Sequence, residues 1–149
     1  MTVPRKALDL KIEFNARYEQ ASTYHNVGRV AQEQRQWEQA EQYYRKALDL
    51  KIEFNDRYEQ AGTYHNLGAV AEEQREWEQA KHNFLTALSL FINYNEKQGV
   101  ILTLQGLAVV WKESADAEIV SGVAEALQIP EQEATKLLSG QNSAQAGSL

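Results

Sequence analysis

Two histidines in the same local context are the first side chains that could do chemistry. His25 and His65 each lie in a Tyr-His-Asn tripeptide. An imidazole can move a proton or bind a metal, but a metal site needs further ligands at a fixed local spacing, and neither histidine has an acidic residue or third histidine so placed. We interpret both as polar residues that line a binding surface. The sequence predicts no metal site and no cofactor.

Carboxylates and nucleophiles do not form a catalytic group either. Glu33, Glu72 and Glu73 could act as acids or bases, but glutamates occur along the whole chain and most are expected to be solvated charges. The sequence contains no cysteine, no glycine-rich phosphate loop and no serine in the context of an exposed nucleophile. We therefore expect no catalytic residues and no enzymatic activity.

Charge and hydropathy limit the classes of partner. The net charge of −6 would repel a phosphate backbone. Residues 123–138 faintly resemble a DNA-binding helix-turn-helix, but three glutamates against one lysine oppose that function. No apolar run approaches the roughly eighteen residues of a spanning helix, and no signal-peptide pattern is present. We expect no nucleic-acid partner, no membrane contact and a cytoplasmic location.

The element that must position all of these side chains is an internal repeat. Residues 5–44 and 45–84 align without a gap and are identical at thirty of forty positions. A third, weaker copy follows at the same spacing, where Leu104, Leu107 and Ala108 keep apolar or small side chains. Internal repeats of this length are typical of stacked arrays.

Each copy is expected to contain two helices, because apolar residues recur at spacings of three and four and no alternating strand pattern occurs. Asn15, Asn55 and Asn95 each recur two residues before an arginine or a lysine, and asparagine tolerates the left-handed backbone that closes a helix. We therefore expect a turn at each asparagine. The predicted first helices cover residues 17–34, 57–74 and 97–113, and the second helices cover 37–54 and 77–94.

Aromatic, small and apolar residues at fixed offsets resemble the tetratricopeptide repeat signature. They are Tyr24, Val27, Gly28, Ala40, Tyr44 and Ala47 in copy one, and Tyr64, Leu67, Gly68, Ala80, Phe84 and Ala87 in copy two. The two glycines should let the paired helices approach closely. The period of 40 residues is similar to the extended-helix subclass found in spindle-orientation adaptors and in long bacterial and cyanobacterial arrays.

The resemblance implies an all-α, right-handed superhelical stack of antiparallel helix pairs whose first helices line a concave groove that binds a peptide or protein. Asn26 and Asn66 could hold a peptide backbone, or could simply be exposed polar residues. Variation among the copies, as at Arg29, fits specificity or neutral drift equally well. The residues assigned to the groove are His25, Asn26, Arg29, Gln32, His65, Asn66, Glu72, Gln105 and Lys112.

The expected organisation is a single repeat domain over residues 1–139. It divides into a partial repeat helix at 5–14, repeats at 15–54 and 55–94, a degenerate repeat at 95–127, a capping helix at 130–139 and a disordered tail at 140–149.

Two apolar clusters on the first helix suggest self-association. Ala7, Leu10 and Phe14 share one side of a helix, and Leu8 and Ile12 lie about a quarter turn away. One cluster lacks a partner at the start of the stack, so a homo-oligomer through this helix is expected. The function expected overall is a protein-interaction scaffold, and the alternative is a structural spacer or self-assembling array without a peptide ligand.

Overall fold

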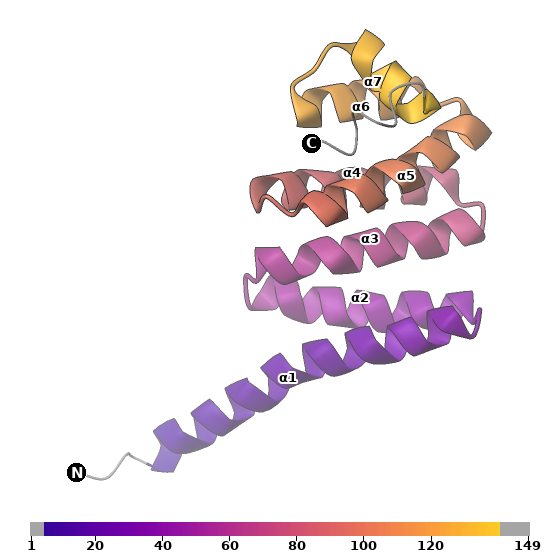
Figure 1. The fold of residues 1–149 in the computed structure, drawn as a ribbon. Helices are drawn as coiled ribbons and strands as arrows, with labels where there is room; N and C mark the ends of the chain where they lie inside the picture. The colour runs from indigo at the N-terminus through magenta and orange to yellow at the C-terminus, as the bar shows by residue number, and fades with distance from the viewer. Residues whose placement is uncertain (1–4, 141–149) are drawn as a thin grey trace. The chain divides into compact units, whose positions relative to one another are not determined.

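The computed structural model describes residues 5–140, and every regular element in that range is an α-helix, as the sequence predicts (Figure 1). The chain divides into two compact units, residues 1–57 and 58–149, which are described separately. The helices are α1 (Arg5–Glu33), α2 (Trp37–Glu53), α3 (Arg57–Glu73), α4 (Trp77–Asn93), α5 (Lys97–Ser114), α6 (Ala117–Leu127) and α7 (Glu131–Ser139).

In the first unit, α1 packs on α2 through small side chains and one ring. Ala40, Tyr44 and Ala47 on α2 are fully buried. A Cβ atom at Gly28 of α1 would lie 2.8 Å from Cδ1 of Tyr44, which is closer than real side chains approach. This confirms that the glycine of the repeat signature allows the paired helices to come together.

The predicted turn at Asn15 is wrong, because α1 continues without a break from Arg5 to Glu33. Figure 1 shows the N-terminal part of α1 running past the end of α2. The other two predicted turns are confirmed: Asn55 and Asn95 have left-handed backbones with φ of 54° and 55°. Residues 5–14 are therefore part of the same helix as the residues that follow.

At the two asparagines that end a helix, the next residue accepts a hydrogen bond from a distant tyrosine. Asp56 accepts a hydrogen bond from the Tyr18 hydroxyl at 3.2 Å. Glu96 accepts an equivalent bond from the Tyr58 hydroxyl at 3.1 Å. The corresponding residue after Asn15 is Ala16, which has no acceptor and is the strongest helix former.

The second unit contains one contiguous core. The Phe84 ring lies between two glycines, since Cβ atoms at Gly68 and Gly106 would come within 2.7 Å and 2.6 Å of it. The core joins α3, α4 and α5 to the C-terminal helices through buried side chains such as Leu88, Leu107, Ile119, Val123 and Leu138.

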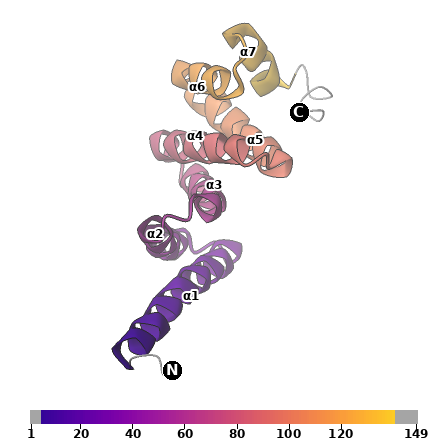
Figure 2. The ribbon, with the colours of Figure 1, turned by 90° about the vertical axis from the view of Figure 1, so that its left-hand side faces the viewer.

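The C-terminal helices complete this unit. Figure 2 shows α6 and α7 next to each other beyond α5, and α6 also contacts α4. Helix α6 begins at Ala117, forty residues after Trp77 begins α4, so the third copy keeps a second helix although it lost the signature residues. Helix α7 follows Pro130 where the sequence predicts the last helix. Apart from Gly140, the predicted tail lies outside the described residues.

Candidate partner-binding surface

In the first unit, the candidate groove residues lie along α1. Asn26 and Arg29 are exposed and lie about one turn apart. Gln32 is only partly exposed, and its Oε1 accepts a hydrogen bond of 2.6 Å from the Tyr44 hydroxyl. Asn26 and Arg29 are thus accessible to a partner, whereas the carbonyl of Gln32 is already bound to α2.

His25 is packed against the helix pair. Its ring centroid lies 5.3 Å from that of Tyr44. Burial, and after it the positive charges of Lys51 and Arg29, lower the pKa of His25 from 6.5 to about 4. The imidazole is therefore neutral at pH 7.

His65 occupies a comparable place in the second unit. Its Nδ1 lies 3.0 Å from Oγ1 of Thr103, and its ring centroid lies 5.5 Å from that of Phe84. Burial lowers the pKa of His65. The histidine thus connects α3 with α4 and α5, and packing accounts for most of its contacts.

The contact between His65 and Thr103 shows that α3 and α5 are neighbours, so candidate residues on these two helices belong to one region. Asn66 and Glu72 on α3 are partly exposed, and Gln105 and Lys112 on α5 are exposed. Burial, and after it the charge of Glu73, raise the pKa of Glu72. The region offers amides, a cation and a partly desolvated carboxyl group.

The structure adds two apolar side chains on one face of α5 to the residues assigned to the groove. Leu102 and Val109 are 43% and 44% exposed. They alternate with Gln105 and Lys112 at spacings of three and four, so all four lie on one stripe. Variation among the copies is the signal that could have found them, because their counterparts in copy one are Ser22 and Arg29.

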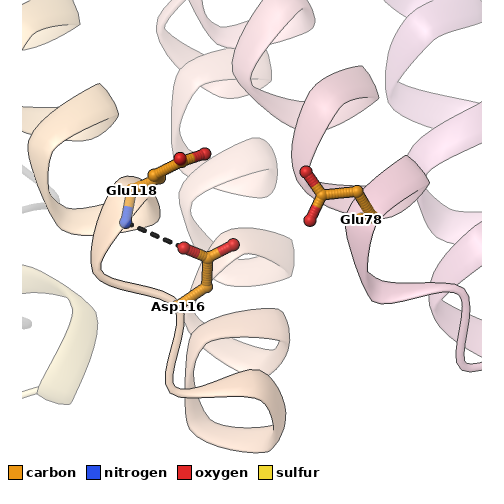
Figure 3. A group of neighbouring side chains, drawn as sticks. All are labelled: Glu78, Asp116 and Glu118. Carbon is orange, nitrogen blue, oxygen red and sulfur yellow. Dashed lines mark hydrogen bonds between the residues drawn. The ribbon is translucent and has the colours of Figure 1, made fainter.

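A group of carboxylates in the second unit has the composition of a metal site. Oxygen atoms of Glu78, Asp116 and Glu118 lie within 4.8 Å of one another (Figure 3). The Nζ atom of Lys81, however, lies 2.8 Å from Glu78, 2.8 Å from Asp116 and 2.6 Å from Glu118. The lysine ammonium occupies the place that a bound cation would take.

This cluster fastens α6 to α4. The hydrogen bonds that Lys81 donates to Asp116, Glu118 and Glu78 raise the pKa of Lys81, and the bond from Lys81 lowers the pKa of Asp116. Asp116 also begins α6, because its Oδ1 accepts a hydrogen bond of 2.9 Å from the backbone N–H of Glu118. Lys81 replaces Glu41 of copy one, which is the only sequence signal for the cluster.

Comparison with known families agrees with this architecture. Residues 20–53 match the family model described as Tetratricopeptide repeat. Residues 20–53 therefore match one tetratricopeptide repeat, and the helix pairs of the chain are similar to an array of this type. Its assignment to the extended subclass stays a prediction. Neither a curated protein nor a solved structure matches the chain.

The family gives the general function. Tetratricopeptide repeats are generally non-enzymatic scaffolds through which proteins bind other proteins or peptides. Within the described residues, no helix is both long and apolar enough to cross a membrane.

Proposed function

We propose that this chain is an interaction scaffold that holds an extended segment of a partner protein along the first helices of its copies. The observation that carries this proposal is the stripe on α5, where Leu102 and Val109 are exposed between polar residues. Single exposed apolar residues are ordinary, but paired ones on the face that the family uses for binding favour a ligand.

The polar residues on the same face suit a peptide. The amides of Gln105 and Asn66 can each donate and accept, which matches the backbone of an extended chain. Lys112 adds a positive charge at one end of the stripe. We therefore expect a partner segment with apolar side chains near the α5 stripe and an acidic group near Lys112.

The variation among copies supports specificity over drift. Position 29 of copy one carries arginine, and its counterparts are Ala69 and Val109. Neutral drift on a solvated face does not by itself favour apolar residues. Where copy one has Arg29, copy three exposes Val109 to water, and no contact within the copy compensates for the lost charged group. A bound apolar side chain would supply that contact.

A selection from a random peptide library against the 149-residue chain tests the proposal. We expect a recurring peptide motif that contains apolar side chains. The motif should lose its binding to the variant Leu102→Asp plus Val109→Asp. The matched control is Ile52→Asp on α2, since Ile52 is 50% exposed but lies on a second helix. Failure to enrich any motif would instead favour the structural spacer.

A further inference from the structure

The N-terminal part of α1 carries side chains that the same sequence buries elsewhere. Residues 5–15 and 45–55 are identical. In the second of these segments Ala47, Leu48 and Lys51 are buried. Every residue from 5 to 20 is exposed, and Leu8, the counterpart of Leu48, is 48% exposed. Residues 5–15 are therefore not covered by contacts like those that bury residues 47, 48 and 51.

The pair α4 and α5 shows what that cover looks like. The two helices are joined by the turn at Asn95, and a Cβ atom at Gly99 would overlap the Phe91 ring, so these two positions face each other. Two repeat lengths earlier, the same positions hold Lys11 and Glu19. Opposite charges at facing positions would attract each other.

The apolar positions agree with this pairing. Leu88 and Thr103 are the counterparts of Leu8 and Thr23, and both are fully buried in the second unit. Thr23 is exposed on α1, as Leu8 is. Residues 5–14 and the side of residues 17–30 that carries Glu19 and Thr23 thus form two complementary surfaces, and both leave these side chains exposed.

These surfaces cannot meet within one chain while α1 is continuous. Eight residues separate Lys11 from Glu19, which places them about 12 Å apart along a helix. We propose that a second copy of the chain is the occupant: two α1 helices pair antiparallel and cross at Asn15. Residues 5–14 of each copy then cover residues 17–30 of its partner.

In this dimer the contacts occur twice because of the two-fold symmetry. Lys11 of each copy faces Glu19 of the other, and Leu8 packs near Thr23. The arrangement is a domain exchange, in which the turn that closes the other repeats opens into a helix and the same contacts form between chains.

Charge reversal tests the pairing in the full-length chain. Sedimentation at rising concentration should show a monomer converting to a dimer. Lys11→Glu and Glu19→Lys each place like charges at both contacts and should weaken the dimer about tenfold or more. Lys136→Glu, an exposed lysine on α7, is the matched control and should change nothing.

The decisive measurement mixes the two single variants. In a mixed dimer both contacts join a glutamate to a lysine, so the equimolar mixture should recover the wild-type affinity, which no effect inside one chain can do. A monomer throughout would overturn the proposal and assign the face to another protein. An unchanged dimer affinity in both single variants, or a mixture whose affinity is as low as that of either variant alone, would also overturn it.

Asn15→Gly provides a second measurement. Glycine weakens a helix interior and readily adopts the left-handed turn, so the variant should fold back on itself and populate more monomer. A dimer of unchanged affinity would rule out a crossing at Asn15.

Discussion

The same eleven residues occur twice in this chain and adopt two different structures. Residues 45–55 end a helix, with Asn55 in the left-handed conformation, and several of their side chains are buried. Residues 5–15 continue into a longer helix and remain exposed. Since the local sequence is identical, the difference must come from what surrounds each segment. Tertiary contacts decide where a helix ends, and local propensity only permits it.

The surroundings of the second segment can be named. Arg17 donates to Glu53 at 2.7 Å, and the rings of Phe54 and Tyr18 lie 5.6 Å apart, so the end of α2 is held against α1. Phe14 also contacts Phe54, with ring centroids 4.9 Å apart. Phe14 therefore helps to hold the end of the later copy in place.

The largest expected difference comes from the same leucine in each segment. Leu48→Ala should reduce the free energy of unfolding by about 2 to 5 kcal/mol, because it leaves a cavity. Leu8→Ala should stay within about 0.5 kcal/mol, as for other exposed sites. Urea unfolding at a concentration where the chain is monomeric measures both. Equal losses would mean that the two segments have the same environment.

The asparagines should respond in opposite directions. Asn55→Ala places a side chain that disfavours the left-handed conformation in the turn and should cost about 1 kcal/mol or more. Asn15→Ala replaces asparagine by a better helix former and should stabilise the chain by up to about 0.7 kcal/mol. Thermal unfolding distinguishes the two, and a loss in both variants would indicate a turn at Asn15.

A smaller effect is expected from Ala16→Asp, which extends the identity of the two segments to seventeen residues, 5–21 and 45–61. Among the described residues no tyrosine lies before residue 16 to donate to the new carboxylate, so α1 should remain continuous at a cost of about 0.5 kcal/mol. Amide exchange at residues 15–17 is the measurement. Loss of protection there would show that the aspartate alone makes the turn.

The smallest expected effect is a change in the pKa of His25 when Lys51 or its counterpart Lys11 is replaced. Lys51→Met should raise this pKa from about 4, but not to 6.5, because burial is the larger cause. Lys11→Met should leave it unchanged. An NMR titration of the imidazole tests both variants.

The lowered pKa of His25 also predicts that the free energy of unfolding depends on pH. Between about 6.5 and about 4 the unfolded chain binds more protons at His25 than the folded chain does, so the free energy of unfolding falls as the pH falls. The decrease should be smaller in Lys51→Met. A decrease as large as in the wild type would show that the charge of Lys51 does not reach the imidazole.

Most of the fold could be predicted because the repeat is local. The period predicts a helix over 37–54, and α2 spans Trp37–Glu53. Asn55 and Asn95 end a helix because the left-handed backbone that asparagine tolerates is also the one that the packing requires there. The turns inside each copy gave no such signal, because their left-handed residues are Arg35 and Arg75, with φ of 61° and 59°.

The site was less predictable, because its contacts join distant parts of the sequence. Lys81 pairs with Asp116, which lies 35 residues away, and no pattern in the repeat connects them. The exposure of Leu102 and Val109 depends on which face of α5 the core leaves uncovered. The assignment of His25 and His65 to a groove came from their polarity, whereas their burial depends on neighbouring rings.

The hydroxyl group of Tyr44 links an interior position of copy one to a position nearer its surface, Gln32. In copy one the buried Tyr44 needs an acceptor, and Gln32 supplies it. The counterparts of Tyr44 in the later copies are Phe84 and Ala124, which have no hydroxyl, and the third copy carries Lys112, a donor only, at the position of Gln32. Loss of an interior hydroxyl therefore releases a surface position to evolve a new charge. By this reasoning a lysine at position 32 of the first copy would leave the hydroxyl of Tyr44 without its acceptor.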